Sequence, residues 1–413
     1  MRNKVLVIGA GIGQVPISLL AKKRGCYLIV VTIPGNYPCI EIADKVYYIN
    51  IYDREEILRV AREENIDAVI SDQNDLMMPT VAYISEHMSL PGNTFNQVQS
   101  YCNKNIFRQN CDKLSIPVPK HIRVVKEEIP VEFADIPFPW MVKPEDSQSS
   151  IGVAKVNSEE EYFIDIKNAL KCSRNQAAIL EEFFVGDEIV VEGFIYKGDY
   201  YNLGVADRRY FDLHNMFIPS QTIFPSIIPD QIIDKCVECE HKMSRYIKPD
   251  FAIVHSEYLV NQETGEIRIV ESALRGGGVY ISSHLLPMAC GIDINDYLLD
   301  CSLGIEIPFD KLYESSKDKK ASAYVCFYLP KGKVKTIEGL EEIQSLPYVH
   351  KCDIEVYAGM ETKEMTYKGQ RLGPIILSGD DRQDIETKIK YVQSLLTIDV
   401  EAYDGLTEGI IWS

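Results

Sequence analysis

Residues 251–282 read FAIVHSEYLVNQETGEIRIVESALRGGGVYIS, and this stretch decides the fold that the sequence predicts. Two runs rich in β-branched and apolar residues flank Glu263–Gly265, a three-residue loop with a glycine where a left-handed backbone is wanted. This pattern predicts a β-hairpin. Pairing Gln262 with Glu266 fixes the register of every other pair in it.

The predicted register places two carboxylates side by side. Glu257 lies opposite Glu271, and Leu259 paired with Ile269 extends the same face as an apolar floor. Two such carboxylates repel each other by roughly 1 kcal/mol in water, and a divalent cation removes that cost. Oxygen ligands of this kind suit magnesium shared with substrate phosphates. The alternative is an exposed pair of like charges that solvent tolerates.

Three further stretches carry residues suited to phosphate chemistry. Arg275 precedes Gly276–Gly278, and an arginine beside permissive backbone suits an anionic intermediate. In PFPWMVKPEDSQSSIGV, Lys143 ends an apolar strand and a small-residue loop follows, although a serine-rich turn is by itself commoner than a phosphate cradle. In AILEEFFVGDEIVVEGFIY, the strand end can read an adenine edge and Glu188 can accept from ribose hydroxyls; the alternative is a solvated edge strand.

The N-terminal glycines of KVLVIGAGIGQVPI form an incomplete dinucleotide motif. Gln14 stands where the third glycine of G-x-G-x-x-G belongs. The second strand, YLIVVTI, ends in Thr32 and Ile33 rather than in the acidic residue that holds a ribose hydroxyl. A nicotinamide oxidoreductase is therefore disfavoured.

Composition excludes several classes of protein. The chain has 413 residues, 61 acidic against 43 basic, and a formal net charge of −18, which disfavours nucleic-acid binding. No apolar run approaches the roughly 18 residues of a membrane span. The eleven scattered cysteines indicate reduced thiols in a cytoplasmic protein. Cys236, Cys239 and His241 resemble a metal site, but no second ligand pair follows at zinc spacing, which favours an ordinary helical pair.

The order of strands and helices predicts an α/β and α+β multidomain protein. Residues 1–95 alternate strands with helices, as in a Rossmann-like domain with a parallel sheet. A second domain is expected over residues 96–310, with a compact α+β lobe at about 120–190. Residues 311–413 predict a separate α+β domain.

The succession Lys104, Lys143, small-residue loop, EEFFVGDE, HSE and ESALRGGG resembles the ATP-grasp superfamily. More narrowly, it is similar to the carboxylate-amine ligases related to biotin carboxylase, carbamoyl phosphate synthetase and the L-amino acid ligases. The resemblance implies a Rossmann-like pre-ATP-grasp domain, a two-lobed ATP-grasp domain whose small lobe is mobile, and an α+β C-terminal domain. In that family the glycine-rich N-terminal turn shapes the substrate cleft.

The resemblance also implies roles for individual residues. The lysines would contact ATP phosphates beneath a mobile loop, and a strand end would hold adenine and ribose above an apolar residue. This nucleotide set is Lys104, Lys143, Ser147, Ser149, Ser150, Ile151, Gly152, Glu181, Glu182, Phe183, Phe184, Val185, Glu188 and Leu259. Glu257 and Glu271 would hold Mg²⁺, with Mn²⁺ as an alternative, and Arg275 with Gly277 would stabilise an acyl phosphate. Asp75, Arg208 and His255 are candidate substrate-binding residues.

One position departs from the family. The usual pattern is Glu-x-Asn before the arginine, and Ala273 occupies the asparagine position here. The predicted function is an ATP-dependent ligase that activates a small carboxylate as an acyl phosphate for attack by an amine. The alternatives are a carbamoyl phosphate synthetase-like enzyme, a phosphoribosylamine-glycine ligase-like enzyme, or a catalytically silent ATP-binding protein. Related enzymes are often dimers, so a homodimer is considered.

Overall fold

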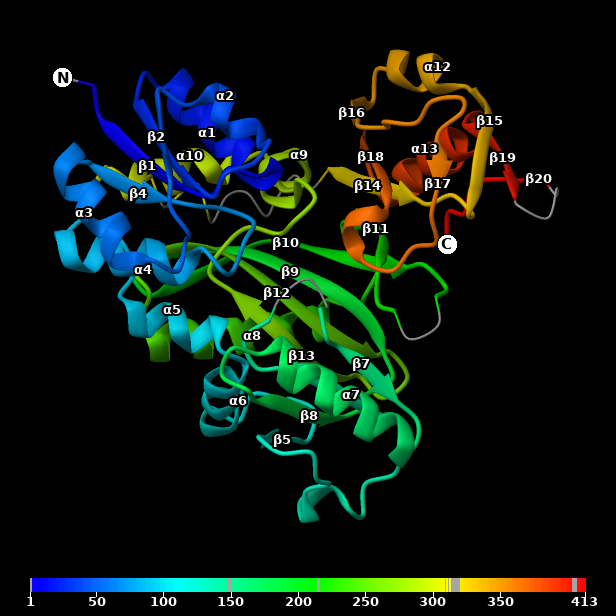
Figure 1. The fold of residues 1–413 in the computed structure, drawn as a ribbon, viewed down its shortest axis with the longest axis horizontal. Coiled ribbons are helices and arrows are strands. Elements are labelled where there is room, and N and C mark those ends of the chain that lie inside the picture. The colour runs from blue at the N-terminus through cyan, green and yellow to red at the C-terminus, as the bar shows by residue number, and fades with distance from the viewer. Residues whose placement is uncertain are drawn as a thin grey trace.

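The structure is a computed structural model, and it describes residues 2–147, 151–213, 216–308, 310, 312, 320–402 and 407–413. Within this part of the chain, three four-stranded sheets surround one sheet of eight strands. In Figure 1 the N-terminal domain and the C-terminal segment lie above strands β9 (Asp187–Tyr196), β10 (Asp199–Tyr210) and β12 (Phe251–Asn261) of the central sheet, and a small lobe lies below these strands.

The N-terminal sheet is parallel, with the strand order β3-β2-β1-β4. Its strands are β1 (Lys4–Ile8), β2 (Tyr27–Thr32), β3 (Lys45–Tyr48) and β4 (Ala68–Ile70). The helices that connect and follow them are η1 (Ile12–Gln14), α1 (Val15–Lys23), α2 (Pro38–Ile42), α3 (Arg54–Glu64), α4 (Met78–Met88), α5 (Phe95–Cys102) and α6 (Lys104–Lys113). The predicted parallel sheet with helical crossovers is confirmed.

Gln14, in the glycine-rich turn after β1, makes hydrogen bonds through both ends of its amide. Its Nε2 donates to the Asp72 carbonyl at 2.6 Å, and its Oε1 accepts from the Gly11 N–H at 3.1 Å. The side chain is buried, so it ties the turn to the end of β4. A glycine at this position, which would complete the dinucleotide pattern, would lose both bonds.

We therefore expect Gln14→Gly, which completes the dinucleotide motif, to lower the free energy of unfolding by about 2 kcal/mol, because it leaves the buried Asp72 carbonyl and the half-buried Gly11 N–H unpaired. Thermal unfolding of both proteins measures the loss. Ile12→Gly is the matched control, since Ile12 is 62% exposed in the same turn. An equal loss in both variants would attribute the effect to backbone flexibility rather than to the Gln14 hydrogen bonds.

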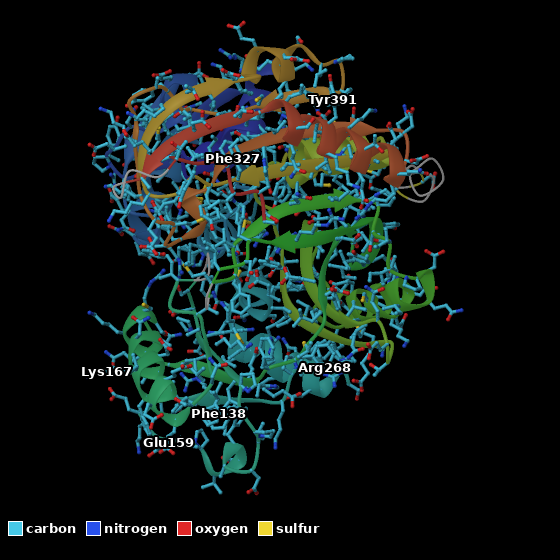
Figure 2. The ribbon with its side chains drawn as sticks, turned by 90° about the vertical axis from the view of Figure 1, so that its right-hand side faces the viewer. Phe138, Glu159, Lys167, Arg268, Phe327 and Tyr391 are labelled. Atoms are coloured by element: carbon cyan, nitrogen blue, oxygen red, sulfur yellow. The ribbon has the colours of Figure 1, made fainter. Side chains whose placement is uncertain are left out.

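The small lobe has an antiparallel sheet of its own, in the order β5-β8-β6-β7, covered by α7 (Figure 1). Its aromatic and aliphatic side chains form a separate core around Trp140 and Tyr162. Phe138, Glu159 and Lys167 mark this lobe at the lower end of the molecule in Figure 2. Its elements are β5 (His121–Val124), η2 (Val131–Phe133), β6 (Trp140–Pro144), β7 (Ala154–Val156), α7 (Glu159–Cys172) and β8 (Ala178–Glu182).

The central sheet has the order β13-β12-β9-β10-β11-β14-β18-β16. Its first five strands are β9 (Asp187–Tyr196), β10 (Asp199–Tyr210), β11 (Pro219–Phe224), β12 (Phe251–Asn261) and β13 (Glu266–Ala273). The accompanying helices are α8 (Asp230–Ile247), η3 (Ile281–Leu285), α9 (Leu286–Cys290) and α10 (Ile294–Ser302). Cys236 and Cys239 lie in α8, where both side chains are buried in the core.

The remaining strands come from the C-terminal segment, because β14 (Ala321–Phe327) pairs with β11. The other elements are β15 (Gly332–Glu338), α12 (Leu340–Ser345), β16 (Val349–Cys352), β17 (Glu361–Thr362), η4 (Lys368–Gln370), β18 (Leu372–Gly379), α13 (Arg382–Leu395), β19 (Thr397–Ala402) and β20 (Thr407–Glu408). Four of these strands form a second sheet, β17-β15-β19-β20. The predicted domain boundaries at residues 95 and 310 remain a proposal. Among the helices described, none is long and apolar enough to cross a membrane.

Candidate functional site

The β12–β13 hairpin brings the two predicted metal ligands together. Glu257 pairs with Glu271, as the sequence predicted. Closer to the turn the register shifts by one residue, so that Leu259 pairs with Arg268 and Asn261 with Glu266. The predicted pairs Gln262–Glu266 and Leu259–Ile269 are therefore wrong. The loop runs from Gln262 to Gly265, one residue longer than predicted.

A bulge at Val270 accounts for both results, because it leaves one extra residue on β13 between the two registers. The Val270 carbonyl accepts a hydrogen bond from Arg108 Nη2 at 2.7 Å. The next backbone group, the Ile269 N–H, donates to the Pro117 carbonyl at 2.9 Å. Side chain and backbone of the preceding segment thus satisfy the polar groups that the bulge leaves unpaired.

A cleft of about 1460 Å³ lies between the lobes and collects most of the predicted site residues. The predicted residues that line it are Asp75, Lys104, Lys143, Ser147, Ile151, Glu181, Glu182, Phe183, Phe184, Val185, Glu188, Arg208, His255, Glu257, Leu259, Glu271 and Arg275. Gly152 and Gly277 do not line it: Gly152 packs on Pro144, and Gly277 packs on Glu192 and His255. Ser149 and Ser150 lie outside the described residues.

Glu181 is a buried carboxylate between two cations. Lys143 Nζ donates to its Oε2 at 2.6 Å, and Arg108 Nε donates to its Oε1 at 2.8 Å. Burial alone would raise the pKa of the Glu181 carboxyl, but Arg108 and Lys143 outweigh burial and lower that pKa to about 2. Its side chain therefore positions Lys143 in the cleft, a contact that the sequence prediction of a backbone role did not include.

Lys104 begins α6 on the other side of the loop after β6. Its Nζ donates to the Ser147 carbonyl at 2.8 Å. Asn103 caps the helix by accepting from the Ile106 N–H at 3.0 Å. The two lysines of the predicted phosphate site are thus held by contacts within the protein in this state.

Arg208 joins the acidic residues of β9 and β12. Its Nη1 donates to Glu188 at 2.8 Å and also pairs with Glu257. Burial alone would raise the pKa of the Glu257 carboxyl, but Arg208 and His255 outweigh burial and hold that pKa well below its usual value. Burial and the neighbouring Glu257 raise the pKa of Glu188. Behind Glu257, His255 Nδ1 pairs with Glu192, which is fully buried.

Glu271 differs from Glu257, because its carboxylate accepts no hydrogen bond from the part of the chain that the structure describes. It lines the cleft next to Ala273, which pairs with His255 in the hairpin register. No group of three or more His, Cys, Asp or Glu side chains among the described residues is arranged to hold a metal ion alone. The pair fits a magnesium ion that draws its remaining oxygens from a bound phosphate.

The C-terminal segment also contributes to the cleft, which was not predicted from the sequence. Tyr367, Lys368 and Arg371 line the same cleft. Arg371 Nη1 donates to the Pro219 carbonyl at 2.8 Å, and burial lowers the pKa of the Lys368 ammonium. In the sequence, this stretch shows only two cationic side chains close to a glycine, and such a pattern is also typical of a surface turn.

Two stretches of the chain match known family descriptions. Residues 111–274 match "D-ala D-ala ligase C-terminus", and residues 325–401 match "L-amino acid ligase C-terminal domain 2". A solved L-amino acid ligase from Bacillus licheniformis superposes with a TM-score of 0.80 over 96% of this chain and 99% of that one, at 18% identity. The chain has the fold of the ATP-grasp ligases. The predicted multidomain ATP-grasp fold is confirmed.

Curated relatives of this chain include formate-dependent phosphoribosylglycinamide formyltransferases. A formate-dependent phosphoribosylglycinamide formyltransferase of Sulfurisphaera tokodaii is 23% identical over 410 residues, covering 96% of this chain and 97% of the relative. Its counterpart in Prochlorococcus marinus is 28% identical over 186 residues, which is 44% of this chain. The chain thus spans 47% of the length of the Prochlorococcus relative. These matches agree with the predicted class, an ATP-dependent ligase.

Nucleotide complexes occur among the structural neighbours of this ATP-grasp chain. The biotin carboxylase domain of the Hydrogenobacter thermophilus 2-oxoglutarate carboxylase was solved as a dimer with MgADP, ADP and bicarbonate. It superposes with a TM-score of 0.71 over 99% of this chain and 91% of that chain, at 15% identity. The residue roles assigned from the sequence stay predictions.

Glu181 should make the unfolding free energy of the protein depend on pH. Because its pKa is lowered from 4.5 to about 2, the stabilisation is fully present above pH 4.5 and is lost as the pH falls towards 2. We expect Glu181→Gln to cost about 3 kcal/mol of unfolding free energy at pH 7 and progressively less below pH 4.5.

Denaturant unfolding from pH 3 to 7 checks this expectation. Glu182→Gln is the matched control, since the neighbouring carboxylate accepts the Lys120 N–H at 3.0 Å and is less buried. A difference between wild type and Glu181→Gln that stays constant over this pH range would contradict the ionised pairing of Glu181.

Proposed function

We propose that this protein is a carboxylate–amine ligase that uses ATP. A carboxylate oxygen of the acid attacks the γ-phosphorus of ATP, the bond to ADP breaks, and an acyl phosphate forms. The amine nitrogen then attacks the acyl carbon, the C–O bond to phosphate breaks, and the amine loses a proton. The products are an amide, ADP and phosphate.

The single observation that supports this proposal best is the convergence of opposed carboxylates and cations on one cleft. Glu257 and Glu271 line it together with Lys104, Lys143 and Arg275. A site of this composition can hold a polyphosphate and neutralise the charge that develops during its transfer. The volume of about 1460 Å³ exceeds the range of about 300–1,000 Å³ typical of sites for one small molecule. This leaves room for an acid and an amine beside a nucleotide.

Glu257 and Glu271 would hold Mg²⁺, which would neutralise phosphate oxygens; Mn²⁺ is an alternative with similar oxygen ligands. The protein's own residues supply the rest. Lys143, oriented by Glu181, and Lys104 would contact phosphates, and Arg275 would bind the anionic intermediate through its planar fork. The phenylalanines and the strand end at Glu181–Val185 would hold the adenine, with Glu188 at the ribose. A cytoplasmic location and a homodimer remain predictions.

A second candidate is a ligase for a phosphoribosyl substrate. It is supported by the Sulfurisphaera relative, a phosphoribosylglycinamide formyltransferase that matches along 96% of this chain. Formate would then be the acid, and the amine would belong to phosphoribosylglycinamide. The reaction sequence would be the same, so the two candidates differ only in substrates.

A phosphate-release screen tests the function. We expect ATP and Mg²⁺ to release phosphate only when a matching acid and amine are both present, across pairs of amino acids and small carboxylates and including formate with phosphoribosylglycinamide. Thermal unfolding with and without MgATP serves as the binding readout. Stabilisation by MgATP without phosphate release from any pair would indicate a silent nucleotide-binding protein, and no stabilisation would contradict the proposal altogether.

Magnesium titration tests the carboxylate pair separately. We expect Glu271→Gln to raise the Mg²⁺ concentration for half-maximal ATP-dependent stabilisation by about tenfold, because one anionic ligand is lost. Ala273→Asn restores an oxygen at the usual family position and should lower this concentration.

The matched control is Glu266→Gln, which changes an exposed carboxylate on the same strand. Identical titration curves for wild type, Glu271→Gln and Ala273→Asn would show that Glu257 and Glu271 form only an acidic patch.

A further inference from the structure

Two aspartates of the N-terminal domain hold the loop that follows β13. Asp72 is fully buried; its Oδ1 accepts from the Gly276 N–H at 2.7 Å, and its Oδ2 accepts from Ser282 Oγ at 2.8 Å. A side chain at Gly276 would collide with both partners, since a Cβ there would lie 2.3 Å from Ser282 and 2.6 Å from Asp72. The loop is therefore fitted closely to the end of β4.

Asp75, three residues further on, binds Arg275 side-on. Arg275 Nε donates to Asp75 Oδ1 at 3.0 Å, and Nη2 donates to Oδ2 at 2.8 Å. The Arg275 side chain is 9% exposed and that of Asp75 is 24% exposed. Parallel hydrogen bonds of this kind fix the plane of the guanidinium as well as its position.

The N–H groups of Arg275 that Asp75 does not use determine which ligand atoms the guanidinium can bind. Nη1 donates to the Gly276 carbonyl at 3.1 Å, which leaves one N–H on each terminal nitrogen. Both Arg275 and Asp75 line the cleft, together with Lys104 and Glu271. An oxyanion formed in the cleft can accept from those two N–H groups without displacing Asp75.

We propose that Asp75 is a positioning residue, which presents the outer edge of the Arg275 guanidinium to the anionic intermediate. The inference rests on the proposed function, because the role of Arg275 belongs to it. It gives the N-terminal domain a direct part in the reaction: Gln14 supports the backbone at Asp72, and Asp72 and Asp75 then hold the arginine loop.

Steady-state kinetics of the wild type and a set of variants test the inference. We expect Asp75→Asn to lower kcat by about 10- to 100-fold, while KM for ATP changes less than twofold, because a misplaced guanidinium affects the reaction and not nucleotide binding. In an Arg275→Lys background the same change should cost less than twofold, since the planar fork that Asp75 orients is already gone. Asp75→Glu, which keeps the carboxylate, should retain more activity than Asp75→Asn.

Asp67→Asn is the matched control, because Asp67 lies in the same domain and its carboxylate accepts the Lys4 N–H at 2.7 Å at an exposed position. Independent effects of the Asp75 and Arg275 changes would overturn the inference. A raised KM for the amine at unchanged kcat would also overturn it, because Asp75 would then bind the amine directly.

An NMR measurement separates this inference from the proposed function, since it needs no turnover. The Nε–H signal of Arg275, assigned by its loss in Arg275→Lys, should exchange slowly with solvent in the wild type. We expect faster exchange and a shifted resonance in Asp75→Asn and no change in Asp67→Asn. An unaltered signal in Asp75→Asn would overturn the positioning role, whether or not the phosphate-release screen succeeds.

Discussion

The hairpin of β12 and β13 changes register by one residue between Glu257 and Tyr258, and the position of both cleft carboxylates depends on that change. If the register at the turn continued unchanged, Glu257 would pair with Val270. Glu271 would then lie on the opposite face of the sheet, because side chains alternate between faces. The bulge therefore decides whether two carboxylates or only one face the cleft, and Arg108 stabilises it through the Val270 carbonyl.

Arg108 also connects this backbone feature to the nucleotide side of the cleft. The same guanidinium pairs with Glu181, which in turn holds Lys143. Two half-buried acids of the cleft have similar partners: Arg208 for Glu257 and Arg275 for Asp75. An unpaired charge in a buried place raises the free energy of the folded state. These ion pairs therefore stabilise the arrangement of the cleft side chains before a ligand binds.

The parts of this arrangement that could be predicted are those that depend on the local sequence pattern. Alternating strands and helices were enough for the N-terminal sheet, and the short loop before Glu266 was enough for the hairpin. The bulge could not be predicted, because the groups that satisfy its backbone, Arg108 and the Pro117 carbonyl, are far away in the sequence. The same applies to Lys368 and to the pairing of Asp75 with Arg275, which depend on how separate domains pack. Glu192 stands alone among the apolar residues of β9, and this pattern could have been used to predict the buried Glu192–His255 pair.

The pairing of β14 with β11 has a consequence for dissecting the chain. All six residues of β11 are buried, and four of them pair with β14. A fragment ending before β14 would turn β11 into an unprotected edge strand, whose free N–H and C=O groups can pair with other chains. The C-terminal segment thus covers the β11 edge of the central sheet, in addition to any part it has in the cleft.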